Sequence, residues 1–107
     1  MMIKSIVRYQ LKDAKDLEHL ISLFQKIRNE AMKRPGYITG ETLVNTENEC
    51  DVLVISTWHS LKNWQDWLTS EGRIKITKQF EPLLGKPYTI LIYEYYLKQE
   101  KRVWSTF

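Results

Sequence analysis

The sequence has few of the residues that form cross-links, metal centres or membrane spans. Its 107 residues include one cysteine, Cys50, and two histidines, which excludes an internal disulfide and a zinc site built only from Cys and His. The longest apolar runs, residues 52–55 and 90–93, are far shorter than the roughly 20 residues of a membrane-spanning helix. The first residues also lack the apolar segment of a signal peptide. We therefore expect a cytoplasmic protein with neither a metal site nor a membrane partner.

Glycine and proline are also scarce, with 4 and 3 copies, so collagen-like repeats and low-complexity tracts are excluded. Apolar residues make up 43% of the chain and charged residues 27%, which is typical of one soluble globular domain. We place this domain at residues 1–97 and expect residues 98–107 to form a tail that packs on a partner subunit. The net charge of +3 is too small to indicate a nucleic-acid surface, and we expect no nucleic-acid partner.

Aromatic residues, in contrast, are abundant, because the chain has 4 Trp and 6 Tyr. So many large rings in a short chain indicate either the aromatic wall of a ligand pocket or a core and dimer interface rich in tryptophan. Composition leaves both interpretations open.

Hydrophobic periodicity predicts the first strand and the first helix. Residues 3–11 alternate between an apolar and a polar face, which is the period of a half-buried strand. The apolar face carries Ile3, Val7, Tyr9 and Leu11. After Asp13, a side-chain N-cap, apolar residues recur at steps of three and four up to Ala31. This pattern predicts a long amphipathic helix that ends before Pro35 and Gly36.

The middle of the chain predicts a hairpin followed by two short helices. Residues 37–44 and 51–58 are rich in β-branched and aromatic side chains and flank the polar stretch 45–49. Ser60 and Ser70 each offer a side-chain cap for a following helix.

The last part of the chain completes the predicted fold. Pro and Gly make residues 81–87 a loop, and residues 88–97 form the final strand. The order βαββααβ predicts a ferredoxin-like α+β fold, with one antiparallel sheet and helices on one face. RNA-recognition domains share a similar order, but their third strand carries a basic-Gly-aromatic signature that residues 51–58 lack. This difference argues against RNA binding.

The final strand is apolar on both of its faces. Its residues divide into Ile90 and Ile92 on one side and Leu91, Tyr93, Tyr95 and Leu97 on the other. Because the helices cover only one face of such a sheet, the second group needs another partner. We expect a homodimer in which the two sheets face each other.

Two stretches of the sequence resemble a known family. Residues 34–37 read Arg-Pro-Gly-Tyr after the first helix, and residues 58–70 read WHSLKNWQDWLTS. In this order and spacing they resemble the antibiotic biosynthesis monooxygenase-like (ABM) domains of the dimeric α+β barrel superfamily. The resemblance covers nearly the whole chain and implies that fold.

The resemblance implies the fold more strongly than it implies one activity. The family includes cofactor-free oxygenases of aromatic polyketides, haem-degrading enzymes and members without an assigned activity. For this chain it implies a cofactor-independent monooxygenase, or a related small-molecule enzyme, that acts on an aromatic or quinone-like substrate. The alternative is a non-catalytic dimeric protein of the same fold that binds a small molecule.

Asn63 and Trp67 are the candidate catalytic residues. They stand four residues apart on one flank of the predicted helix, beside Trp64, which belongs to the core stripe. The resemblance places them at positions where the family has polar and aromatic cavity residues. Trp67 would then wall the substrate ring, and Asn63 would hydrogen-bond a substrate oxygen. In the alternative interpretation, Trp67 is a packing residue and Asn63 is solvated.

Four further residues are candidates for substrate binding. Tyr9, Tyr93 and Tyr95 could line a cavity beside the sheet, with Arg8 as a contact for an anion. Packing in a dimer interface explains the same residues equally well. His59 follows Trp58 on a predicted turn, and we expect it to be solvated.

The sequence also predicts that the protein does not degrade haem. Haem-degrading relatives carry a histidine ligand on the helix after the 58–70 motif and an asparagine in the first strand. The matching residues here are Thr77 and Val7, and a hydroxyl is a poor ligand for ferric haem iron. We expect no Soret shift on titration with hemin and no biliverdin-like product, whereas a stoichiometric shift followed by such a product would contradict this prediction.

Overall fold

A computed structural model of the chain describes residues 1–96, so Leu97 and the predicted tail, 98–107, lie outside the described residues. The first half of the chain forms β1 (Ile3–Gln10), the 3₁₀ turn η1 (Ala14–Asp16), α1 (Leu17–Ala31), β2 (Tyr37–Asn45) and β3 (Asn48–Trp58). The second half forms α2 (Leu61–Leu68), α3 (Glu71–Phe80), the 3₁₀ turn η2 (Glu81–Leu83) and β4 (Thr89–Glu94).

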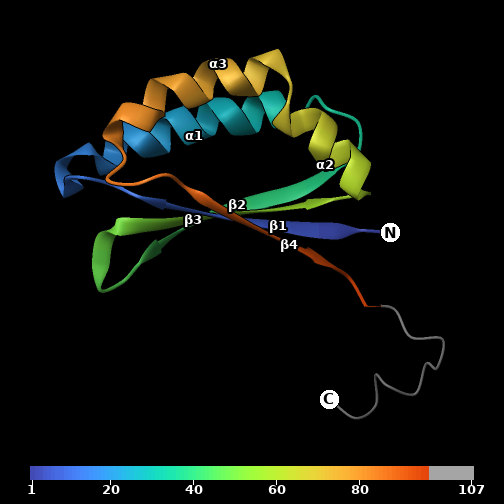
Figure 1. Cartoon of the computed structure of the whole chain (residues 1–107), viewed down its shortest axis with the longest axis horizontal. Helices are drawn as coiled ribbons and strands as arrows, with labels where there is room; N and C mark the ends of the chain where they lie inside the picture. Colours follow the sequence, from blue (N-terminus) through green and yellow to red (C-terminus); the bar gives the residue numbers. More distant parts are fainter. Residues whose placement is uncertain (97–107) are drawn as a thin grey trace, which may run out of the picture.

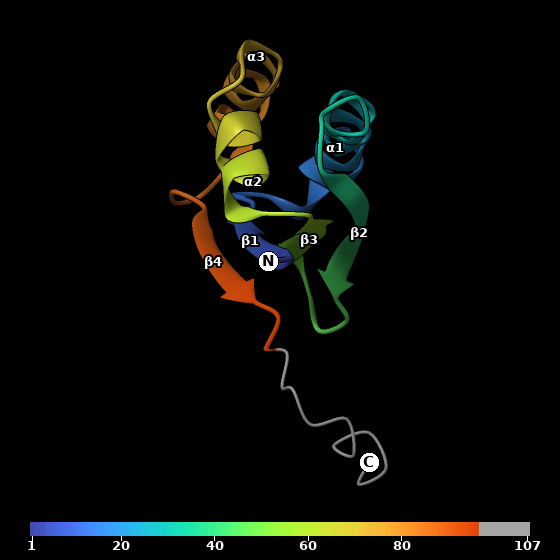
Figure 2. The same ribbon diagram turned by 90° about the vertical axis from the view of Figure 1, so that its right-hand side faces the viewer.

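The strands form one antiparallel sheet with the order β2-β3-β1-β4. The helices α1, α2 and α3 all lie on one face of this sheet, and in both views no helix of the described residues covers the other face (Figures 1 and 2). The predicted ferredoxin-like α+β class is therefore confirmed.

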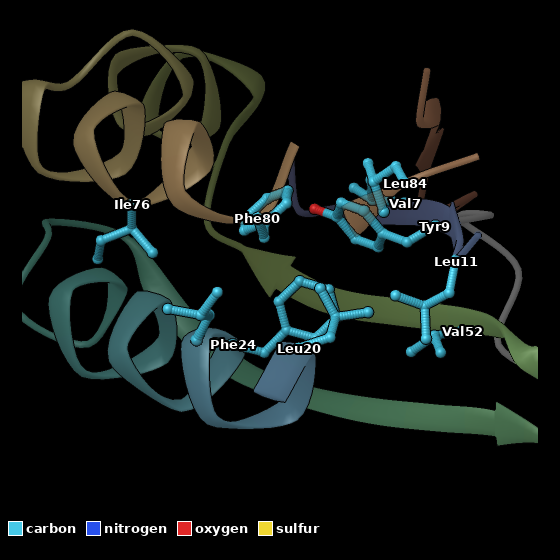
Figure 3. Packing of buried hydrophobic residues seen from close by; sticks show 10 residues of the cluster. Val7, Tyr9, Leu11, Leu20, Phe24, Val52, Ile76, Phe80 and Leu84 are labelled. Atoms are coloured by element: carbon cyan, nitrogen blue, oxygen red, sulfur yellow. The ribbon is translucent and has the colours of Figure 1, made fainter. Parts of the chain in front are cut away.

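The main core lies where β1 faces α1 and α3. Alternate side chains of β1 point to the helices, as the sequence predicts, and Val7 and Tyr9 are buried there. The Tyr9 ring centroid lies 4.7 Å from that of Phe24 and 5.3 Å from that of Phe80 (Figure 3). Because each such side chain stabilises the fold by roughly 1.5–3 kcal/mol when buried, these rings fix α1 and α3 against the sheet.

A second cluster lies under α2. Trp64 and Trp67 both point inward from this helix and pack with Ile3, Ala31 and Trp58. They are three residues apart and therefore share one face of the helix. The sequence predicted a core position for Trp64, and Trp67 is as deeply buried.

Three element boundaries differ from the prediction. The hairpin is longer, because β3 begins at Asn48 and the turn is tight. The Asn45 side chain accepts a hydrogen bond from the Glu47 backbone N–H at 2.8 Å, so polar residues support this turn. The first helix is preceded by η1, which Asp13 caps by accepting from the Lys15 N–H at 3.0 Å. In contrast, β4 is shorter than predicted and ends at Glu94.

The helix-free face of the sheet carries exposed apolar side chains. The β-sheet register places Ile6 between Ile55 and Leu91 on this face, while Tyr93 lies next to Lys4. Leu91 and Tyr93 are 55% and 57% exposed, which is unusual for side chains of this size on a sheet. The predicted division of β4 into two apolar faces is confirmed for residues 90–93.

Gly36 makes the turn that leads from α1 into β2. Its φ is 86°, in the left-handed region that glycine adopts most easily. Its carbonyl accepts a hydrogen bond from the His59 N–H at 2.8 Å. The Asn63 side chain lies so close to Gly36 that a Cβ at this position would overlap it. Gly36 therefore ties the end of α1 to the start of α2.

We predict that Gly36→Ala destabilises the protein by about 1–3 kcal/mol, because the new Cβ strains the backbone and collides with Asn63. Urea unfolding measures this change. Gly85→Ala is the matched control, since a Cβ there would make only ordinary contacts, and it should stay within roughly 0.5 kcal/mol of the native protein. Equal stability of the two variants would contradict the role of Gly36.

Candidate functional site

A small cavity of about 60 Å³ lies between the helices and the sheet. Its aromatic lining consists of Tyr9, Phe24, Tyr37, Trp58, Trp64 and Trp67, and its polar lining consists of Ser5, Arg28, Thr42, Ser56 and Arg73. We call it the helix–sheet cavity. A larger hollow of about 460 Å³ lies over the loop before β4, but its charged residues, Glu81 and Lys86, are exposed. The smaller space holds the buried polar groups and is the better candidate.

Stacked rings build one wall of the cavity. The ring centroids of Trp58 and Trp67 lie 6.2 Å apart, and the angle between the ring planes is 24°. Tyr37 meets Trp58 edge-on, with centroids 5.3 Å apart. The indole Nε1–H of Trp58 donates to the Ser56 hydroxyl at 3.0 Å, so its polar atom is satisfied. The result is a firmly held aromatic surface.

Arg73 brings a positive charge into the cavity. It stands in the first turn of α3, where its backbone N–H is 3.4 Å from the capping hydroxyl of Ser70. Only 6% of the residue is exposed, and its guanidinium lies 5.7 Å from the Tyr88 ring centroid. No carboxylate among residues 1–96 forms an ion pair with it. Arginine is seldom buried without such a partner.

The Tyr9 hydroxyl lies close enough to this guanidinium for the Arg73 charge to act on the pKa of Tyr9. Burial raises the pKa of Tyr9 above its ordinary value, and the nearby Arg73 charge offsets only part of this rise. Tyr9 is therefore protonated at neutral pH. It can donate a hydrogen bond to a ligand oxygen but cannot act as a base.

Two hydroxyls at the cavity have no partner. The oxygens of Ser5 and Tyr37 are buried, and neither forms a hydrogen bond within the described part of the chain. The register places Ser5 opposite Ser56, which in turn pairs with Gly40. A Cβ at Gly40 would lie 2.7 Å from the Tyr37 hydroxyl, so glycine leaves room for that oxygen. Buried hydroxyls of this kind are free to bind a polar group of a ligand.

The structure separates the two candidate catalytic residues. Trp67 lines the helix–sheet cavity. Asn63 is half-buried at the start of α2, outside the cavity lining, and its Oδ1 accepts a hydrogen bond from the Ser60 hydroxyl at 2.8 Å. The Ser60 oxygen accepts in turn from the Asn63 backbone N–H at 3.1 Å. Asn63 thus takes part in the N-terminal cap of α2.

The four candidate substrate-binding residues lie on opposite faces of the sheet. Tyr9 faces the helices and the cavity. Arg8 is exposed on the other face and forms an ion pair with Asp51 at 2.8 Å, which lowers the pKa of Asp51. Tyr93 and Tyr95 are exposed beside Lys4, whose Nζ lies 5.8 Å from the Tyr95 ring centroid. A single chain therefore does not bring these four residues together.

Arg73 is the functional candidate that sequence reasoning missed. A charged residue on a predicted surface helix is normally solvated, so its type alone does not indicate a buried position. The signal was nevertheless present, because Arg73 precedes Ile76, Thr77 and Phe80 at steps of three, four and seven residues. All of these residues are buried on one stripe of α3.

The residues relevant to haem are also buried. Val7 lines the cavity, and the Thr77 hydroxyl has no hydrogen-bond partner within residues 1–96.

His59 is exposed, as predicted. Across the same residues, no group of three His, Cys, Asp or Glu side chains is placed to hold a metal ion. None of the described helices has the length and apolar character needed to cross a membrane.

The family model of the antibiotic biosynthesis monooxygenases (ABM) matches residues 2–78. The chain belongs to the ABM family. The matched range includes the aromatic wall and Arg73 and confirms the resemblance read from residues 34–37 and 58–70. No curated protein matches the sequence.

Solved structures share the ABM fold at low sequence identity. SnoaB, a cofactor-independent oxygenase from Streptomyces nogalater, is 12% identical, with a TM-score of 0.77 over 94% of this chain and 98% of SnoaB. Rv0793 from Mycobacterium tuberculosis is 12% identical, with a TM-score of 0.78 over 94% of this chain and all of that one. A conserved protein from Methanosarcina mazei Go1 is 18% identical, with a TM-score of 0.80 over 87% and 91% of the two chains. At these identities the likeness establishes the fold.

Proposed function

We propose that the protein is a cofactor-independent monooxygenase that oxidises an aromatic or quinone-like substrate in the helix–sheet cavity. The observation that carries this proposal is the buried guanidinium of Arg73 beside a wall of tryptophan rings in an ABM-family chain. A positive charge held in an apolar space stabilises an oxyanion more strongly than water does.

The reaction that fits this site takes its electrons from the substrate. An anthrone-type CH₂ group gives up a proton to solvent hydroxide before it enters the cavity, because the described lining offers no carboxylate or imidazole as a base. The resulting enolate then reduces dioxygen. One oxygen atom becomes the carbonyl oxygen of the product, and the other leaves as water with the two hydrogens of the CH₂ group. The protein has to hold the ring, stabilise the enolate oxygen and exclude water.

The first two of these tasks have candidate residues. Trp67 and Trp58 hold the ring by stacking. Arg73 and the Tyr9 hydroxyl stabilise the enolate oxygen. Asn63 is a further candidate for this donor role, implied by its match to family cavity positions. It would have to donate through its amide group, since Oδ1 already accepts from Ser60.

Admission of a ring requires the cavity to widen. Its volume of about 60 Å³ is well below the roughly 300–1,000 Å³ of typical ligand sites. Arg28 of α1 and Thr42 of β2 are exposed lining residues and therefore form its rim. Rotation of these two side chains would widen the mouth of the cavity.

Oxygen uptake with a panel of anthrones and hydroquinones tests the function. We expect the protein to consume one O₂ per anthrone. Trp67→Phe should raise KM by roughly tenfold, and Tyr9→Phe should lower kcat by on the order of 10². Asn63→Ala tests the role implied by the resemblance, which predicts a loss in kcat of similar size. Binding of these compounds without any oxygen uptake would contradict the proposal and favour the alternative of a binding protein.

We also propose that the protein is a homodimer in which the helix-free faces of two sheets meet. The exposed side chains of Leu91 and Tyr93 on this face support the proposal, since a second copy would bury them. Whether residues 98–107 add to this interface stays a prediction.

Light scattering tests the dimer and should report about twice the mass of one chain at micromolar concentration. Leu91→Lys should shift the protein to a monomer, because it places a charge within the apolar face. Ile74→Lys is the matched control on α3, where Ile74 is 41% exposed, and it should leave the dimer intact. A monomeric native protein, or equal effects of the two variants, would rule out this interface.

A further inference from the structure

We propose that the helix–sheet cavity is an anion site and that its ligand is a small aromatic acid, with a carboxylate or phenolate oxygen bound by Arg73. This inference rests on the proposed function in one respect, namely that the cavity is the ligand site. It adds the charge of the ligand, which neither the fold nor the family specifies.

The charge of the lining supports an anion. Among the described residues that line the cavity, both charged side chains are arginines, Arg28 at the rim and Arg73 inside, and none is a carboxylate. A cavity with low-dielectric walls and charges of one sign attracts the opposite charge. A neutral or cationic ligand would bring no negative charge to balance that of Arg73.

The surroundings of Arg73 compensate its charge only in part. The Tyr88 ring offers a cation–π contact, and the Tyr9 hydroxyl lies nearby as a neutral dipole. A guanidinium carries five N–H donors arranged to bind two oxygens of one carboxylate. An aromatic acid would supply those oxygens, and the protonated Tyr9 could donate to the same anion.

Once the cavity has widened, the rest of its lining suits the aromatic part of such a ligand. The nearly parallel rings of Trp58 and Trp67 provide a flat apolar surface. The unpartnered hydroxyls of Ser5 and Tyr37 can hydrogen-bond a second polar substituent.

The cavity lining also lacks a base that could generate the anion. Within residues 1–96 it contains no carboxylate and no imidazole, and its tyrosines include Tyr9, whose pKa is raised. A ligand that is already an anion in water needs no protein base, which is consistent with a binding site for acids.

The tryptophans provide a readout of binding that does not depend on activity. A Trp104→Phe background leaves three tryptophans, Trp58, Trp64 and Trp67, all of which line the cavity. Their ¹⁵N–¹H indole signals can be followed by NMR during titration with benzoate, with its neutral analogue benzamide, and with 4-nitrophenolate as the phenolate arm.

We expect benzoate to bind at least about tenfold more tightly than benzamide, since a hydrogen-bonded charge is gained. Arg73→Met should remove this preference, because it weakens the binding of benzoate far more than that of benzamide. Lys78→Met, which removes an exposed charge from the same helix, should retain the preference. If 4-nitrophenolate binds and benzoate does not, the anion is a phenolate; the reverse identifies a carboxylate.

Stability gives a second, independent measurement. Arg73 has no carboxylate partner among residues 1–96, so Arg73→Met should have a Tm equal to or above that of the native protein. Benzoate should raise the Tm of the native protein but not that of Arg73→Met. The anion site would be overturned if neither benzoate nor 4-nitrophenolate bound more tightly than benzamide. Equal effects of Arg73→Met and Lys78→Met on binding, or no indole shift with any ligand, would also overturn it. Oxygen uptake with neutral substrates alone would support the proposed monooxygenase and contradict the anion site. Arg73-dependent binding of anions without any oxygen uptake would support the anion site and contradict the monooxygenase.

Discussion

Arg73 carries a full positive charge to a place where apolar rings surround it and no carboxylate of residues 1–96 pairs with it. Burial of an unpaired charge is costly, and a stability requirement alone would favour an apolar side chain of similar length. The neighbouring groups respond to this charge, since Tyr88 places its ring beneath the guanidinium and Tyr9 keeps its proton next to it. A site that stabilises an oxyanion must hold its positive charge in place before the ligand binds, although this charge lowers the stability of the empty protein.

The rest of the fold holds this charge in position. α3 carries Arg73 in its first turn and ends at Phe80, whose ring packs edge-on against Tyr9 (Figure 3). The helix that carries the charge is therefore fixed to β1. At the other end, the turn at Gly36 and the cap of α2 hold the tryptophan wall in place. The sheet face that points away from the helices takes no part in this cavity, which leaves it free for contact with a second subunit (Figure 2).

The sequence predicted the fold well because each element has a strong local signal. The alternation in residues 3–11, the Pro-Gly stop after α1 and the serine caps of α2 and α3 all act over a few residues. The site was harder to predict, because it depends on which faces meet in space. Tyr9 and Tyr93 have the same residue type but lie on opposite faces of the sheet, and Arg73 belongs to a buried stripe only because α3 turns that stripe toward β1.

The most direct test of this account is a crystal structure of the protein with 4-bromobenzoate, in which the bromine atom marks the ligand by anomalous scattering. The account predicts a bromine peak between the helices and the sheet near the tryptophan wall, with the carboxylate oxygens within hydrogen-bond distance of the Arg73 guanidinium. A ligand bound on the helix-free face beside Tyr93, or one in the cavity with its carboxylate turned away from Arg73, would contradict it.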